Sequence, residues 1–274
     1  MSTAIVVQAR TGSSRLPGKV LLPVAGAPVL QRQIERIQAA SPRRPFELVV
    51  ATTIDSADDP IAELCRRIGL ACFRGHPTDL LQRHLGAAAL AEADVVVKIP
   101  SDCPLIDPAA IALVLDFWDD ADGSLDYLSN LHPPSWPDGN DVEVMSFEAL
   151  AQAAREARAP HEREHTTPFL WDNPHLFRIG NVTWPGGLDL SLTHRFTLDY
   201  REDWRFVDAV YQALWTASRP IFGLDQILAF LEEHHEVMAL NAAYAGVNWY
   251  RHHLDRLRTI TAAETRHEPK VEGA

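Results

Sequence analysis

A cluster of basic and small residues lies near the start of the chain. The stretch ARTGSSRLPGK, residues 9–19, follows a short apolar run and carries Arg10, Arg15 and Lys19 among glycines and serines. Small residues let backbone amides approach phosphate oxygens, and the cations neutralise those oxygens. The pattern therefore predicts a polyphosphate-binding loop. The residues leave one alternative open, a basic surface turn that only links a strand to a helix.

Two aspartates are candidates for holding a metal ion. Asp102 comes two residues after the valine-rich segment DVVVKIP, residues 94–100, and Pro104 constrains the turn around it. Asp199 ends the segment RFTLD, which we expect to be a strand. Mg²⁺ prefers oxygen ligands and is often bound by one or two carboxylates together with phosphates. A turn-capping role for Asp102 stays open, whereas Asp107, before Pro108, is typical of a helix N-cap.

The elements that must position these residues follow an alternating pattern. We expect strands at residues 4–7, 47–53, 70–75 and 94–100, and helices at about 28–40, 58–68, 80–90 and 108–117. This alternation predicts an α/β fold, Rossmann-like and doubly wound, with a mostly parallel sheet. Ligands of such sheets lie beyond the carboxyl ends of the strands. The basic loop and residues 101–107 both follow strands, so we expect them at the same edge.

The pattern changes after about residue 124. We interpret residues 124–194 as an inserted elaboration that closes the site or forms a dimer contact. In and after it we expect strands at 124–130, 141–147 and 195–199, a hairpin or edge at 177–184, and helices at about 147–158, 161–172, 204–216 and 223–258. Residues 1–260 are predicted to form one domain, and residues 261–274 a flexible tail.

Composition excludes several classes of protein. The 274 residues are 46% hydrophobic and 23% charged, which is ordinary for a globular protein. A formal net charge of −12 argues against a nucleic-acid-binding surface. The three cysteines lack CxxC spacing, so we expect free thiols rather than disulfides or a zinc site. No apolar run reaches the length of a bilayer span and no signal-peptide pattern is present, so we expect no membrane association and a cytoplasmic location.

A second polar cluster, HEREHTTPF, spans residues 161–169. Arg163, Glu164 and His165 are candidates for contacts with a sugar acid or phosphate, although charged residues at a helix start are usually solvated. The chain contains no GxSxG, HExxH, GxxxxGK[ST] or GxGxxG motif. Their absence argues against the usual hydrolase, zinc-protease, P-loop and dinucleotide-binding sites.

Five motifs in order give the chain a family resemblance. ARTGSSRLPGK, PSDCPLID, DGNDVEV, REHTTPF and TLDYREDW resemble the SpsF-type cytidylyltransferases of spore coat polysaccharide synthesis, which are related to the CMP-Kdo and acylneuraminate cytidylyltransferases. The resemblance runs from residue 4 to about residue 240. It implies a nucleotidyltransferase of the nucleotide-diphospho-sugar transferase type, with CTP as nucleotide, Mg²⁺ as cofactor and a homodimer as assembly.

The resemblance also implies roles for residues. Arg10, Arg15 and Lys19 match the triphosphate-binding and catalytic cations, and Asp102 and Asp199 match the metal-binding acids. The remaining nucleotide contacts are expected from Gln8, Ala9, Gly12, Ser13 and Ser101, and acceptor contacts from Asp141, Glu143, Arg163, Glu164 and His165. Thr11 and Asn140 depart from the family pattern, in which Met and Leu are usual.

The implied reaction is attack by an acceptor oxygen on the α-phosphorus of CTP, with release of pyrophosphate. The acceptor is a small molecule: a sugar, a sugar acid, or a phosphate or phosphonate. Two alternatives stay open, the same fold acting on GTP or another triphosphate, and a catalytically silent nucleotide-binding or scaffold subunit.

Overall fold

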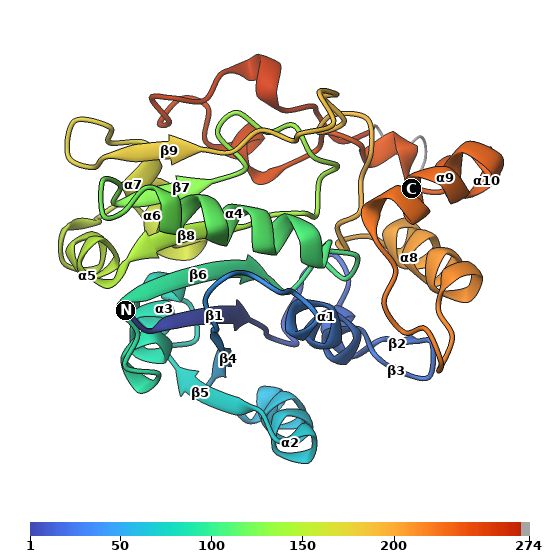
Figure 1. Ribbon diagram of the computed structural model, residues 1–274, viewed down its shortest axis with the longest axis horizontal. Coiled ribbons are helices and arrows are strands. Elements are labelled where there is room, and N and C mark those ends of the chain that lie inside the picture. Colours follow the sequence, from blue (N-terminus) through green and yellow to red (C-terminus); the bar gives the residue numbers. More distant parts are fainter. Residues whose placement is uncertain (270–274) are drawn as a thin grey trace.

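A seven-stranded sheet forms the centre of the protein in the computed structural model, which describes residues 1–269 (Figure 1). The strands follow the order β5-β4-β1-β6-β8-β7-β9. Their bounds are β1 Thr3–Gln8, β4 Glu47–Thr53, β5 Ala71–Gly75, β6 Val95–Pro100, β7 Tyr127–Ser129, β8 Glu143–Ser146 and β9 Ile179–Asn181, and β2 Pro23–Val24 pairs with β3 Ala27–Pro28 in a separate hairpin. The expected α/β, mostly parallel sheet is confirmed.

The sheet register brings the ends of three strands together. Strand β1 pairs in parallel with both β4 and β6, so that Gln8 lies beside Ala51 on one side and Pro100 on the other. Strand β8 runs antiparallel to β6 and to β7, and β9 returns parallel to β7. The loops after β1 and β6 therefore leave the same edge of the sheet, as the sequence predicts.

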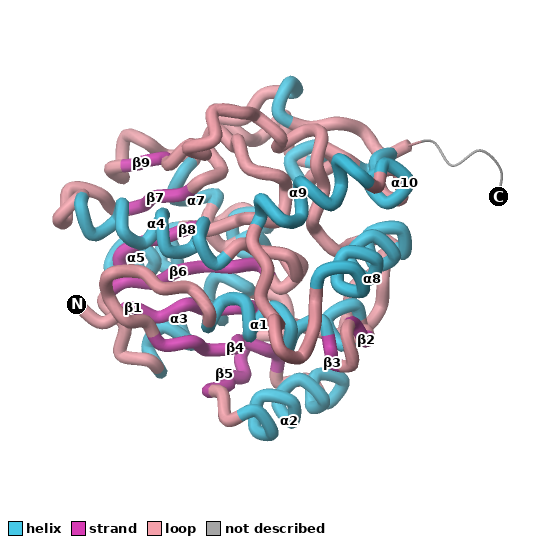
Figure 2. The backbone as a smooth tube through the Cα atoms, turned by 45° about the vertical axis from the view of Figure 1, so that its right-hand side comes forward, coloured by secondary structure: helices cyan, strands magenta, loops and turns pink. Residues whose placement is uncertain are grey.

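Helices cover both faces of the sheet (Figures 1 and 2). Their bounds are α1 Val29–Gln38, α2 Asp59–Ile68, α3 Leu80–Leu90, α4 Pro108–Asp120, α5 Phe147–Glu156, α6 Pro160–His165, α7 Pro168–Trp171, α8 Arg201–Leu214, α9 Leu224–Glu233 and α10 His235–Met238. The predicted helices near 28–40, 58–68, 80–90 and 108–117 agree with α1 to α4. Asp107 caps α4 by accepting a hydrogen bond from the Ala109 amide, as expected.

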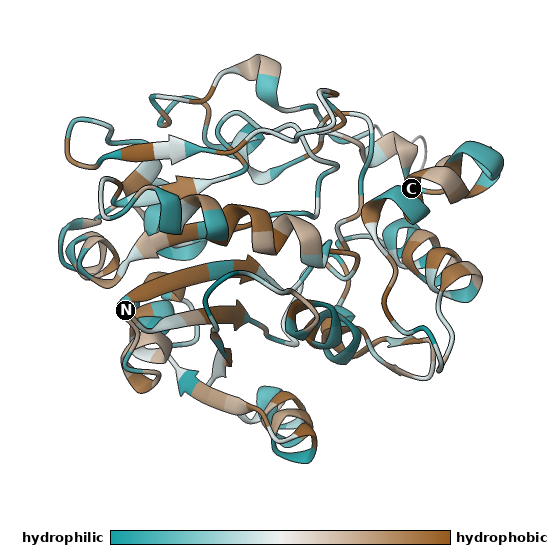
Figure 3. Ribbon diagram, in the orientation of Figure 1, coloured by the Kyte–Doolittle hydropathy of each residue, from teal (hydrophilic) through white to brown (hydrophobic). Residues whose placement is uncertain are grey.

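Side chains alternate between two hydrophobic cores along the central strands. On β1, Ile5 and Val7 pack into the core beneath α1, α2, α4 and α8, whereas Ala4 and Val6 face the core beneath α3 and α5. The alternation is the two-residue period of a strand buried on both faces. Figure 3 shows the resulting hydrophobic colouring of β6, the neighbour of β1. Cys65 and Cys103 are buried free thiols, and Cys72 is half-buried.

Three predicted elements differ in the structure. The single helix predicted at 161–172 is two short helices, because Thr166 between them has a positive φ of 73°. Residues 195–199 form no strand of the sheet: Arg195 makes one isolated bridge to Asp138. The helix predicted at 223–258 is broken at His234 into α9 and the short α10, and after Met238 the chain continues in loops and single turns.

The described part of the C-terminal tail, which the sequence predicts to be flexible, makes hydrogen bonds to the preceding chain. The Arg266 amide donates to the Gly246 carbonyl at 2.7 Å, and the Tyr200 hydroxyl donates to Glu268 at 2.6 Å. The residues 270–274 of that prediction lie outside the described residues. Among the described helices, none is long and apolar enough to cross a membrane.

Candidate active site

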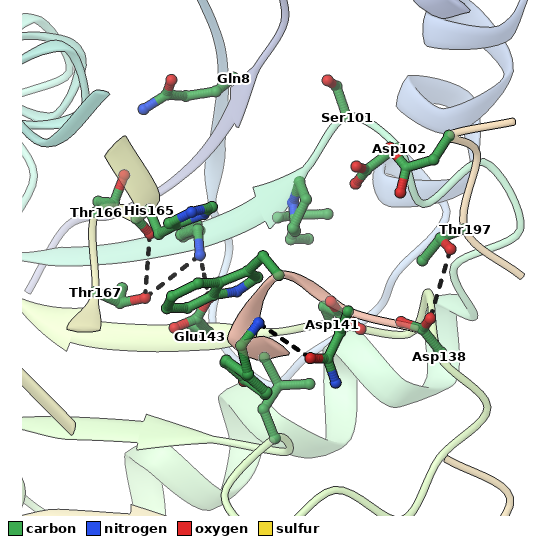
Figure 4. Close-up of a pocket in the computed structure, with 18 of the residues that line it drawn as sticks. Gln8, Ser101, Asp102, Asp138, Asp141, Glu143, His165, Thr166, Thr167 and Thr197 are labelled. Atoms are coloured by element: carbon green, nitrogen blue, oxygen red, sulfur yellow. Dashed lines mark hydrogen bonds and ion pairs between the residues drawn. The ribbon is translucent and has the colours of Figure 1, made fainter. Parts of the chain in front are cut away.

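A cavity of about 450 Å³ opens at the carboxyl ends of β1 and β6 (Figure 4). Its lining comes from the basic loop after β1, the turn after β6, and segments around residues 130–143, 164–167, 191–199 and 246–250. Figure 4 shows Gln8 and Asp102 on opposite sides of this space. The sequence therefore predicted the position of the cavity, at the strand ends where an α/β sheet binds its ligands.

A buried carboxylate anchors the basic loop. Asp58 accepts hydrogen bonds from the Thr11 amide and the Thr11 hydroxyl, both at 2.7 Å, and a third from the Thr53 hydroxyl at the end of β4. Burial alone would raise the pKa of Asp58, but these donors lower it below its usual value. Thr11, which departs from the family pattern, thus fixes the loop to the sheet.

Two cations of the loop meet both candidate metal ligands. The Lys19 ammonium lies 3.1 Å from Asp102 and 2.9 Å from Asp199, and Arg15 lies 2.6 Å from Asp199. The residues come together because the Leu198 amide donates to the Asp102 carbonyl at 2.8 Å, which fixes the segment before Asp199 beside the turn after β6. One site therefore contains residues 10–19, 102 and 199, although the first and the last are more than 180 positions apart in the sequence.

Asp199 is held ionised by the cations around it. Burial favours its neutral form, yet Lys19, Arg15 and Arg195 bring its pKa well below the usual value. Arg195, itself buried, also pairs with Asp138 and with Asp203 at the start of α8. Arg195 carries no motif signal in the sequence beyond its place in RFTLD, and sequence reasoning missed it.

The carboxylates fit a divalent cation. A positively charged group, the Lys19 ammonium, already lies between Asp102 and Asp199, and Asp138 and Asp141 line the same side of the cavity (Figure 4). Among residues 1–269, no group of three or more His, Cys, Asp or Glu side chains is arranged to hold a metal alone. Two carboxylates completed by phosphate oxygens is a common arrangement for Mg²⁺.

A buried polar cluster occupies the end of the cavity next to Gln8. Arg83 donates to the Gln8 amide oxygen at 3.1 and 2.6 Å, and the Gln8 nitrogen donates to the Leu80 carbonyl at 2.6 Å. His84, 1% exposed, contacts Gln8 through Nδ1, while its Nε2 has no partner among the described residues. Burial, and then Lys98, lower the pKa of His84 to about 3, so the ring is neutral. Sequence reasoning missed Arg83 and His84, because both read as ordinary helix residues of α3.

The opposite wall contains a buried ion pair. Glu143 on β8 pairs with Lys98 on β6 and accepts a hydrogen bond from the Tyr127 hydroxyl at 2.6 Å. Burial opposes ionisation of Glu143, but Lys98 and the hydroxyl donors lower its pKa. Asp141 lies nearer to Asp102, and burial together with that neighbour raises its pKa to about 7.

The remaining candidates fall into two groups. Ala9, Ser13, Ser101, Glu164 and His165 line the cavity, whereas Gly12 does not. Arg163 does not line the cavity either: its Nε donates to Asp79 at 2.7 Å, which ties α6 to the start of α3. Asn140, although at the cavity, is 1% exposed and accepts from the Asp107 amide at 2.9 Å, so it holds loops together.

Comparison with known proteins gives consistent matches. The family model described as "Cytidylyltransferase" matches residues 4–248. An uncharacterised protein of Methanocaldococcus jannaschii, MJ1063, is 31% identical over 86% of this chain and 93% of its own length. The spore coat polysaccharide biosynthesis protein SpsF of Bacillus subtilis is 26% identical over 84% of this chain and 93% of its own. The structure of a cytidylyltransferase from Leptospira borgpetersenii superposes with a TM-score of 0.80 at 29% identity, covering 87% of this chain and 97% of that one.

Proposed function

Because this chain belongs to the cytidylyltransferase family, we propose that it transfers CMP from CTP to a small-molecule acceptor in a Mg²⁺-dependent reaction that releases pyrophosphate. The chain is thus a nucleotidyltransferase, and CTP is its nucleotide. One observation carries the proposal: three loop cations and two carboxylates, distant in sequence, meet in a single cavity at the carboxyl edge of the sheet.

The loop cations are assigned to the triphosphate. Arg10 lines the cavity and has no ion-pair partner among the described residues, so its charge is available to a phosphate. Lys19 and Arg15 pair with Asp102 and Asp199 in the structure. When the nucleotide binds, its phosphates replace those carboxylates as partners of the two cations. The charges freed on the carboxylates are then available to the metal.

Asp102 and Asp199 would hold Mg²⁺. Bound there, the ion supplies neutralisation of phosphate charge and a template for the reacting oxygens. Arg195 and Asp203 orient Asp199, since the Asp203 carboxylate accepts from the Asp199 amide at 2.9 Å. The base is assigned to the end of the cavity at Gln8, Arg83 and His84, whose mutual hydrogen bonds fix their orientation before any ligand arrives.

The chemical step needs little covalent work from the protein. The acceptor oxygen forms a bond to the α-phosphorus, the bond from that phosphorus to the bridging oxygen breaks, and pyrophosphate leaves with the electron pair. A hydroxyl acceptor gives up its proton to water in this step. Arg15 and Lys19 stabilise the charge that develops on pyrophosphate, and the rigid loop aligns the reactants. The acceptor is proposed to be a sugar-type molecule, and the enzyme a cytoplasmic homodimer.

The test is pyrophosphate release from CTP. The full chain with Mg²⁺ and a panel of sugars, sugar acids and phosphonates should release pyrophosphate from CTP with at least one acceptor, and should lose that activity in EDTA. Equal release from GTP, ATP and UTP would contradict the assignment of the base. Binding of CTP without release for every acceptor would support the silent-subunit alternative.

A further inference from the structure

The acceptor side of the cavity has a wall built by the C-terminal segment. We define the strap as residues 245–269, which the structure carries over β7 and β9 (Figure 1, red). Its first residues, Gly246 to Tyr250, and Glu264 line the cavity. The match to the family model ends at residue 248, so Trp249, Tyr250 and Glu264 lie beyond it. Part of this wall therefore lies outside the residues that the family model matches.

The strap is fastened along its length. Arg195 donates to the Val247 carbonyl at 3.0 Å near the start, and the Asp172 carboxylate accepts from the amides of Arg258 and Thr259 at 2.8 Å in the middle. Leu257 and Ile260, each 7% exposed, pack into the core beneath α5 and α7. These attachments hold the strap in one position, so its cavity-facing side chains form a fixed surface.

That surface is aromatic. The Trp249 ring stacks on His165 with centroids 3.8 Å apart and planes 11° apart, and Tyr250 meets Trp171 edge-on at 6.0 Å. His132 lies 4.4 Å from the Trp171 ring. Burial lowers the pKa of His165 to about 3 and that of His132 to about 4, so both rings are neutral at pH 7. Aromatic faces with a few polar groups suit a compact polar ligand with an apolar side.

The charges on this side favour a cation over an anion. Of the described cavity-lining residues here, the cations are Lys98, paired with Glu143, and Arg195, paired with three aspartates. Two cavity-lining carboxylates, Glu164, which is exposed, and Glu264, which accepts hydrogen bonds from Thr261, have no basic partner within 4.0 Å among the described residues. A carboxylate brought into this space would face like charge with no free cation, whereas an ammonium would meet carboxylates and aromatic faces.

We propose that the strap and the wall that contains the Lys98–Glu143 ion pair select an acceptor whose body is a polyhydroxylated ring. This ring carries an amine or no charge, and not a carboxylate. The attacking atom of the acceptor lies beside Asp102 and Asp199, and the strap contacts the rest of the acceptor. The inference rests on the proposed function for the identity of the site as an acceptor pocket. Trp249 is its central specificity-determining residue.

The charge assignment is tested with three sugars that share a glucose ring. Glucosamine, glucose and glucuronate are titrated into the full chain loaded with CMP and Mg²⁺, and their affinities are measured by ligand-detected NMR. Glucosamine should bind at least about tenfold more tightly than glucuronate, with glucose between them. Equal or tighter binding of glucuronate would overturn the proposal, and so would failure of all three sugars to bind.

The strap assignment is tested in parallel with matched tryptophan variants. Trp249→Ala should weaken glucosamine binding at least about tenfold, and Trp249→Phe should restore most of it. Trp215→Ala, at the C-terminal end of α8 and outside the cavity lining, should leave it unchanged. The affinity for CTP should be the same in all variants, which also shows that they are folded. Unchanged sugar binding by Trp249→Ala would overturn the proposal, whereas absence of CTP binding by the wild type would instead overturn the proposed function.

Discussion

At the scale of single residues, Asp102 and Asp107 separate two roles that look alike in the sequence. Both are aspartates in the turn after β6, but Asp102 contacts Lys19 at the cavity whereas Asp107 caps α4 and accepts from the Leu224 amide. The sequence distinguished them by the proline that follows Asp107. It could not supply Arg83, His84 or Arg195, because their importance comes from partners far along the chain.

Asp102→Asn is expected to lower kcat by about 10²–10³, since one of the two proposed metal ligands would lose its charge at the reacting phosphates. The measurement is pyrophosphate release at saturating CTP and Mg²⁺. Asp107→Asn is the matched control: Asn is an equally good N-cap, so this variant should keep wild-type turnover. Similar losses in both variants would mean that the turn is needed for folding rather than for the metal.

Arg163→Ala is expected to spare the site. Arg163 pairs with Asp79 and donates to the carbonyls of Ala154 and Ala157 at 3.2 Å, so its removal should cost about 1–3 kcal/mol of stability. The KM values for CTP and acceptor should stay within about twofold of the wild type, because the cost falls on stability and not on the reaction. Chemical denaturation and steady-state kinetics on the same sample measure the two effects. A large rise in acceptor KM would show that Arg163 contributes to acceptor binding.

At the scale of elements, the basic loop at residues 9–19 depends on an acid outside its motif. Asp58, at the start of α2, holds Thr11 by two hydrogen bonds, and Thr53 at the end of β4 supplies a third donor. Its pKa in the folded protein lies below the usual value. A lowered pKa stabilises the fold above the unfolded pKa, near 4, and this contribution is lost as the pH falls through the folded value.

Asp58→Asn should therefore destabilise the protein by about 1–3 kcal/mol at neutral pH. The difference from wild type should shrink as the pH falls below about 4, because protonated Asp58 also loses its charge. Urea unfolding at several pH values measures it. A difference in the free energy of unfolding that stays constant at every pH below about 4 would show that the Asp58 charge contributes nothing to stability.

Element boundaries were predictable where local patterns dominate. The segment ELVVATT and the helix over Leu80–Leu90 appear as predicted, since a buried run and a capped helix depend mainly on their own residues. The prediction was wrong at 195–199, where Phe196 and Thr197 favour a strand but only Arg195 makes an isolated bridge, to Asp138. It was also wrong at 161–172, where Thr166 interrupts the helix. In both places tertiary contacts decide the conformation.

At the scale of the whole molecule, the site exists because the chain returns to the sheet edge three times. The basic loop leaves β1, the Asp102 turn leaves β6, and the segment before α8 brings Asp199 from the far end of the elaboration. The alternating pattern predicted the first two arrivals. The arrival of Asp199 and the position of the strap depend on contacts of Arg195, Asp172 and Tyr200. These contacts leave no periodic signal in the sequence.

The assembly is a separate prediction at this scale. Within the described residues, β9 pairs with β7 alone, so its other edge has no paired strand. We expect a homodimer, and light scattering at micromolar concentration should give twice the mass of one chain. A monomeric mass across the working concentration range would show that the chain does not form a homodimer.

The central claim is that the cavity binds CTP with a divalent metal, and thermal unfolding with each of the four nucleoside triphosphates measures it most directly. A ligand at one hundred times its Kd adds about 2.7 kcal/mol to the free energy of unfolding. With Mg²⁺, CTP should raise the Tm more than ATP, GTP or UTP, and EDTA should remove most of the rise. A larger rise with another triphosphate, or none with CTP, would contradict the account.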